Sequence, residues 1–150
     1  MDAAYANADD RKSTLGYVFI ILGGAVTWKS KKQGVVALSS IEAEYVALSE
    51  ATCEAIWLRS LYKELGLAQK YPTQIWGDNE GAIVMAKDPK FHQRSKHIDI
   101  KWHAIRDMIR EKSIMTESCQ DYQQTTDIMT KALPCAKHKQ HVHEMGVAPA

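Results

Sequence analysis

The 150-residue sequence lacks the features that mark several large classes of protein. It has no apolar run near the roughly 20 residues that a membrane-spanning helix requires, and its first residues lack the charged-then-apolar order of a secretory signal. Its three cysteines, Cys53, Cys119 and Cys135, are far apart and form no C-x-x-C pair, which disfavours a disulfide framework or a cysteine zinc site. These absences favour a soluble intracellular protein with free thiols.

An excess of either charge is also lacking, since 19 Lys and Arg residues nearly balance 18 Asp and Glu residues. The formal net charge of +1 gives no global attraction to a polyanion, so a nucleic-acid surface must come from local clusters of Lys and Arg. At 45% hydrophobic and 25% charged residues, the chain has the balance of one globular domain with a continuous core.

The first half of the sequence predicts a hairpin followed by a long helix. Residues 16–22 are β-branched and aromatic, Gly23 and Gly24 supply a turn, and residues 25–31 alternate apolar with polar side chains. Apolar residues then recur at steps of three and four over residues 40–65. Ser39 and Glu42 have the spacing of a capping box at the start of this helix.

The second half alternates strands with helices, which predicts an α/β sheet. We expect strands at residues 72–77 and 113–118, and helices at residues 80–86, 97–112 and 126–133. Pro134 is expected to end the last helix. The domain is therefore predicted to span residues 1–134, with residues 135–150 forming a polar, His-rich and Lys-rich tail that is frayed rather than packed.

Two acidic residues, Asp78 and Glu44, lie at positions where metal ligands are often found in α/β proteins. Asp78 follows a strand and precedes a helix, which is a usual ligand position, although an aspartate there also caps helices. Glu44 lies on the apolar stripe of the long helix, where a carboxylate is costly unless it is paired or binds a metal. It could equally lie at a solvated edge of that stripe near the helix start.

Two further acidic residues carry little signal by themselves. Asp127 begins the last predicted helix, where unpaired amide groups favour a carboxylate in any case. Asp2 is most simply a solvated residue at the chain start. Phosphodiester hydrolysis by a pair of divalent ions would need such carboxylates to converge from different elements.

The sequence segments around these four residues resemble the C-terminal ribonuclease H region of copia-type retrotransposon Pol polyproteins. They are DDRKSTLGYVFIILGGAVTWKSKKQ, VALSSIEAEYVALSEA, IWGDNEGAIVMAKDPKFHQRSKHIDIKWHAIR and TTDIMTKALP, and they match in order from Asp2 to about Pro134. The resemblance implies a ribonuclease H-like α/β fold, with a mixed five-stranded sheet flanked by helices. It also implies metal-dependent endonuclease cleavage of the RNA strand of RNA/DNA hybrids during reverse transcription.

By position in the resemblance, Asp2, Glu44, Asp78 and Asp127 correspond to the family's four catalytic carboxylates. They would hold two Mg²⁺ ions, with Mn²⁺ as a substitute. The resemblance further suggests the RNA/DNA hybrid, and the reverse transcriptase and integrase regions of the same polyprotein, as partners, in a cytoplasmic virus-like particle or the nucleus. Candidate nucleic-acid-binding residues, which would contact phosphates and, for the asparagine, a 2′-hydroxyl, are Lys29, Lys31, Lys32, Asn79, Arg94, Lys96 and His97.

The sequence departs from the family at its start, where only Met1 precedes Asp2. We therefore expect a truncated first strand and unpaired backbone groups beside it. An alternative reading is a catalytically inactive retrotransposon remnant that acts at most as a nucleic-acid-binding module. An integrase-like enzyme is disfavoured because the well-placed glutamate, Glu44, lies on the first long helix rather than late in the domain.

Overall fold

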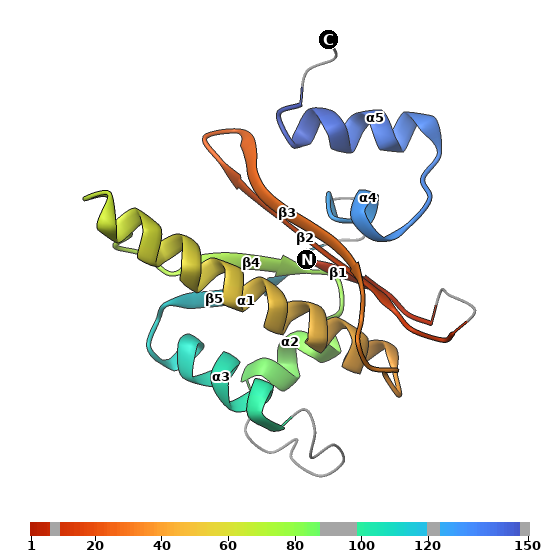
Figure 1. Cartoon of the computed structure of the whole chain (residues 1–150), viewed down its shortest axis with the longest axis horizontal. Coiled ribbons are helices and arrows are strands. Elements are labelled where there is room, and N and C mark those ends of the chain that lie inside the picture. Colours follow the sequence, from red (N-terminus) through yellow and green to blue (C-terminus); the bar gives the residue numbers. More distant parts are fainter. Residues whose placement is uncertain (7–9, 88–98, 120–123, 148–150) are drawn as a thin grey trace.

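The computed structural model describes residues 1–6, 10–87, 99–119 and 124–147, with side chains left out at 99–102. Three strands come first, helices and two further strands follow, and helices lie on both sides of the hairpin formed by residues 14–32 (Figure 1). Within these ranges, no helix is long and apolar enough to cross a membrane. The elements are β1 (Asp2–Ala4), β2 (Thr14–Ile21), β3 (Gly24–Lys32), α1 (Ser40–Glu64), β4 (Thr73–Gly77), α2 (Glu80–Lys87), α3 (Asp99–Arg110), β5 (Ile114–Ser118), α4 (Asp127–Thr130) and α5 (Cys135–Glu144).

The strands form the expected α/β, ribonuclease H-like arrangement, but they divide into two sheets. One is antiparallel with the order β1-β2-β3, and the other is a parallel pair of β4 and β5. A single five-stranded sheet, as predicted, would need β1 to pair with β4. In the described residues the three-residue strand β1 pairs with β2 and forms no ladder with β4.

One hydrogen bond marks where the two sheets approach each other. The Met1 α-amino group donates to the Trp76 carbonyl on β4 over 2.7 Å, while Asp2 pairs with Gly16 on β2. Beyond this contact a cavity of about 940 Å³ separates β2 from β4, with Tyr17 and Ile75 among its lining residues. The cavity thus lies between the two sheets, where β1 and β4 form no ladder.

Helix α1 forms the centre of the core and begins where the capping pattern predicted. The Ser39 hydroxyl accepts the Glu42 N–H over 3.1 Å, as an N-cap does. Glu42 reaches back one residue further than expected, because its Oε2 accepts the N–H of Leu38 over 2.7 Å. Small and apolar residues of α1 let it pack closely on β1 and β2, and the fully buried ones are Ala43, Tyr45, Ala47, Leu48, Ala51 and Ala55.

The C-terminal residues form a docked helix, so the prediction of a frayed tail is wrong for the part that is described. Helix α5 buries the His141 side chain completely, and the Ala25 N–H at the hairpin turn donates to the Met145 carbonyl over 2.8 Å. Pro134 is the N-cap of α5 rather than the end of α4, which is a single turn. Proline suits this place because the first helical N–H groups have no partner within the helix.

Candidate metal centre

Three of the four predicted carboxylates meet at one point. Ligand oxygen atoms of Asp2, Glu44 and Asp78 all lie within 4.8 Å of one another. They come from β1, from the second turn of α1 and from the residue after β4. The structure therefore brings three of the four predicted residues together from separate elements.

Backbone contacts explain how each carboxylate reaches this point. Strand pairing with Gly16 fixes Asp2, and the Ala3 N–H donates to Glu44 Oε1 over 2.8 Å, which ties α1 to β1. At the start of α2, capping belongs to Asn79, whose Oδ1 accepts the Ala82 N–H over 3.0 Å. The sequence allowed Asp78 either to cap α2 or to bind a metal. Asn79 caps the helix in the structure.

The cluster is electrostatically costly without a cation. Burial raises the pKa of Glu44 to about 8, the negative charges of Asp2 and Asp78 act in the same direction, and the Ala3 hydrogen bond opposes them. Glu44 is only 4% exposed, and its Oε2 has no hydrogen-bond partner in the part of the chain that is described. A buried carboxylate with an orphaned oxygen is stable in its charged form only beside a positive charge.

The donor set fits a hard divalent cation. Carboxylate oxygens are the ligands that Mg²⁺ and Ca²⁺ prefer, and Mg²⁺ is usually held by one or two carboxylates together with water and substrate phosphate. The half-buried Asp78 lies at the solvent side of the cluster, whereas Asp2 and Glu44 are buried. The residues present therefore suit an ion that keeps some of its coordination for a ligand arriving from solvent.

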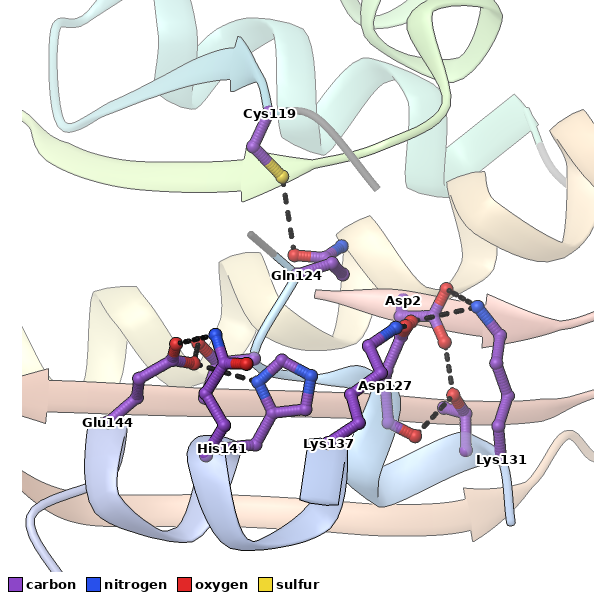
Figure 2. Close-up of polar contacts among 11 residues, drawn as sticks. Asp2, Cys119, Gln124, Asp127, Lys131, Lys137, His141 and Glu144 are labelled. Atoms are coloured by element: carbon purple, nitrogen blue, oxygen red, sulfur yellow. Dashed lines mark hydrogen bonds and ion pairs between the residues drawn. The ribbon is translucent and has the colours of Figure 1, made fainter. Parts of the chain in front are cut away.

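The fourth carboxylate, Asp127, lies beside this cluster but is paired with lysines. Its Oδ1 lies 2.8 Å from Lys131 Nζ and its Oδ2 lies 2.7 Å from Lys137 Nζ (Figure 2). Lys131 Nζ is also 3.4 Å from Asp2 Oδ1, so this ammonium group bridges the two aspartates. The structure thus brings Asp127 to the edge of the site, and its ligation of a metal stays a prediction.

Ion pairing also sets the pKa values at this edge. Burial of Asp127 would raise its pKa, but the hydrogen bonds from Lys131 and Lys137 outweigh burial and hold the pKa below its ordinary value. For Lys131, burial lowers the pKa, whereas the bond to Asp127 and the charge of Asp2 raise it well above the ordinary range. Both partners are therefore charged at neutral pH.

Gly16 is the residue that lets α4 approach the cluster. A Cβ atom at this position would lie 2.7 Å from Met129 Cβ and 2.9 Å from Thr130 Cγ2. Because glycine leaves this space empty, α4 packs directly on β2, and the Thr130 hydroxyl donates to Asp2 Oδ2. The absence of a side chain on β2 thus brings Asp127 and Thr130 next to Asp2.

The predicted nucleic-acid-binding residues are only partly described. Lys29 pairs with Glu50 over 2.8 Å and Lys32 with Asp10 over 3.5 Å, while Lys31 is exposed. Side chains of a strand alternate between faces, so Lys29 and Lys31 share one face and Lys32 lies on the other. Asn79, half-buried, adjoins Asp78. The remaining candidates, Arg94, Lys96 and His97, lie outside the described residues.

Three polar residues of the site were missed in the sequence, namely Thr130, Lys131 and Lys137. The i,i+4 spacing of Asp127 and Lys131 is a known ion-pair signal on helices and could have identified the first lysine. Lys137 lies on a separate helix after Pro134, so no local pattern connects it with Asp127.

Comparison with known proteins identifies relatives among transposon polyproteins. The chain is 42% identical over 126 residues, or 84% of its length, to the "Retrovirus-related Pol polyprotein from transposon TNT 1-94" of Nicotiana tabacum. It is 35% identical over 147 residues, or 97% of its length, to the corresponding polyprotein from transposon RE2 of Arabidopsis thaliana. The chain covers only 9% and 10% of these two relatives.

A shorter match involves a different kind of protein. The chain is 60% identical over 58 residues to "Secreted RxLR effector protein 161" of Plasmopara viticola, covering 38% of this chain and 41% of that protein. A stretch of this length is too short to include both Asp2 and Asp78. No family model and no solved structure matches the chain. The chain is therefore homologous, over most of its length, to a small part of retrovirus-related Pol polyproteins from plant transposons.

Proposed function

We propose that this chain is a metal-dependent ribonuclease H, an endonuclease that cleaves the RNA strand of RNA/DNA hybrids during reverse transcription of a retrotransposon. The observation that carries the proposal is the convergence of Asp2, Glu44 and Asp78 within 4.8 Å. Homology to part of Pol polyproteins supports it, because copying RNA into DNA leaves such a hybrid to be removed. Its partners would be the hybrid and the reverse transcriptase and integrase regions of the same polyprotein.

The chain's own residues would divide the work as follows. Asp2, Glu44 and Asp78 hold the first divalent ion, and Asp2 and Asp127 are the candidates for the second. Bound Mg²⁺ or Mn²⁺ supplies charge neutralisation, activation of water and stabilisation of the leaving 3′-oxygen. Hydrolysis forms a bond between water oxygen and phosphorus and breaks the bond from phosphorus to the 3′-oxygen, which leaves a 5′-phosphate and a 3′-hydroxyl.

In this proposal Glu44 would fix the position of the ion. Its Oε1 accepts the Ala3 N–H, which leaves the buried Oε2 without a hydrogen-bond partner in the described residues. Preorganised ligands of this kind need no rearrangement when the substrate phosphate arrives. The more exposed Asp78 then lies where the phosphate and its neighbouring ribose enter, beside the Asn79 amide, which can donate to a 2′-hydroxyl.

Substrate positioning would rest on the lysines of β3. Lys31 is exposed, and Lys29 on the same face is engaged by Glu50 across a partly exposed pair that is weak in water. Phosphates can therefore compete with Glu50 for Lys29 at little cost. Contacts of this kind position a duplex without reading its sequence.

The direct test is cleavage of an end-labelled RNA/DNA hybrid in Mg²⁺ and in EDTA. The expected result is cleavage of the RNA strand alone, dependent on the metal and lost in Asp78→Asn. Asp107→Asn on α3 is the matched control, because the Asp107 carboxylate pairs with the exposed Arg110 on the same helix, and this variant should cleave like the parent. Salt-sensitive hybrid binding without metal-dependent cleavage would instead identify a non-catalytic nucleic-acid-binding module.

A further inference from the structure

Lys131 occupies the space between the two aspartates expected to share a second ion. Its Nζ lies 3.4 Å from Asp2 Oδ1 and 2.8 Å from Asp127 Oδ1 (Figure 2). Asp2 is 1% exposed and Asp127 5% exposed, so the ammonium group lies over two buried carboxylates. Lys131, itself an exposed residue, is therefore a cation supplied by the chain at the edge of the three-carboxylate cluster.

A divalent ion held by these two oxygen atoms would compete with the ammonium group for them. Mg²⁺ takes its ligand oxygens at about 2.0 to 2.1 Å in near-octahedral geometry. Lys131 Nζ already contacts both Asp2 Oδ1 and Asp127 Oδ1, so an ion held by both oxygens would have to take over contacts that the ammonium group now makes. Ion and lysine are thus alternative partners of the two carboxylates.

Helix α5 supplies a second lysine that pairs with Asp127. Lys137 Nζ lies 2.7 Å from Asp127 Oδ2, so both oxygens of this carboxylate are already paired. The helix itself is anchored by the buried His141, whose Nδ1 lies 2.7 Å from Glu144 Oε2, and by the Thr125 hydroxyl that donates to the same Glu144 oxygen over 2.9 Å. The C-terminal helix therefore holds a second positive charge against Asp127.

The balance of charge points to a single ion with both lysines in place. The four ionised carboxylates are faced by two lysine ammonium groups and the Met1 amino group, so one divalent ion already removes the excess negative charge. A second divalent ion beside the unchanged lysines would leave an excess of at least two positive charges, which is unfavourable. Withdrawal of Lys131, which contacts both Asp2 and Asp127, would lower that excess.

From this geometry we infer that Lys131 competes with the second divalent ion for Asp2 and Asp127. The chain binds one ion at Asp2, Glu44 and Asp78, and it binds a second only when Lys131 moves away. This inference rests on the proposed function, since it assumes that the carboxylates bind divalent ions. Lys131 is then a positioning residue that sets how many ions the site holds at a given metal concentration.

Titration of the whole chain with Mn²⁺, followed by calorimetry and by electron paramagnetic resonance of the free ion, tests the inference. The parent protein should bind one Mn²⁺ at the first site and a second at least tenfold more weakly. Lys131→Met has a similar length and no charge, and it should tighten the second site at least tenfold without weakening the first. Lys131→Arg keeps the positive charge and should retain the weak second site.

A lysine outside the site provides the control for loss of charge. Lys139 lies on α5 and is exposed, so Lys139→Met should leave both affinities unchanged. Circular dichroism in EDTA checks that every variant is folded. Two sites of similar affinity in the parent, or a second site unaffected by Lys131→Met, would overturn the inference alone. Failure of both parent and Lys131→Met to bind any Mn²⁺ would overturn the proposed function and the inference with it.

Discussion

Replacement of Glu44 by Gln should remove the largest electrostatic cost in the metal-free protein. Gln keeps an oxygen that can accept the Ala3 N–H, so the link between α1 and β1 is preserved. What changes is the charge, because Glu44 contributes a carboxylate within 4.8 Å of Asp2 and Asp78. The variant therefore separates the charge of the cluster from its packing.

The size of the effect follows from the pKa of Glu44, which is raised from 4.5 to about 8. A group with a raised pKa in the folded protein holds its proton there while the unfolded chain has lost it. Stability therefore falls as pH rises from about 4.5 to about 8. At roughly 1.4 kcal/mol per pH unit, Glu44 contributes a loss of about 4 kcal/mol between pH 5 and pH 8, or about 10 °C in Tm for a chain of this size. The Met1 amino group, whose pKa is lowered by burial, acts in the opposite direction over this range.

Thermal unfolding in EDTA and in Mg²⁺, from pH 5 to pH 8, measures this effect. In EDTA the wild-type Tm should fall relative to that of Glu44→Gln as the pH rises, and Glu44→Gln should be the more stable protein at pH 8. Mg²⁺ should raise the wild-type Tm at pH 8 and leave Glu44→Gln nearly unchanged. Glu64→Gln, at an exposed position of the same helix, should behave like wild type. Parallel EDTA curves for wild type and Glu44→Gln would refute the reasoning.

Three other changes have defined outcomes. Gly16→Ala should displace α4 and cost about 1 to 3 kcal/mol by overpacking, seen as a lower Tm that Gly34→Ala, at an open position, does not share. His141→Ala should release α5, so that trypsin cleaves the tail faster while the core resists, and unchanged cleavage would contradict the docking seen here. Lys31→Ala should weaken hybrid binding and reduce the salt-dependence slope by about 1 with Tm unchanged. An unaltered slope would exclude Lys31 from the phosphate contacts.

Local sequence patterns were sufficient for most elements that build the site. The hairpin, the long helix and the strand before Asp78 followed from alternation, helical spacing and capping residues, and each lies within a few residues of its expected bounds. Glu44 could be identified as a candidate because a carboxylate on an apolar stripe is costly unless it is paired or binds a metal. Convergence with Asp2 was different, since only the family resemblance distinguished Asp2 from a solvated chain start.

The C-terminal part could not be predicted because its contacts are few and distant. In α5 the burial is concentrated in His141, with Met145 buried just beyond the helix, and one histidine among polar neighbours produces no visible apolar stripe. The sequence predicts that Pro134 ends one helix, although proline is equally suited to begin the next helix. The division into two sheets likewise depends on which strands pair, and the composition of a strand does not specify its neighbour.

The central claim is that Asp2, Glu44 and Asp78 together bind a divalent cation. Anomalous diffraction from crystals of the whole chain grown with Mn²⁺ tests it most directly. The account predicts a strong anomalous peak within coordination distance of oxygen atoms from all three carboxylates, absent from crystals of Asp78→Asn. A map without that peak, or with Mn²⁺ bound only elsewhere on the molecule, would contradict it.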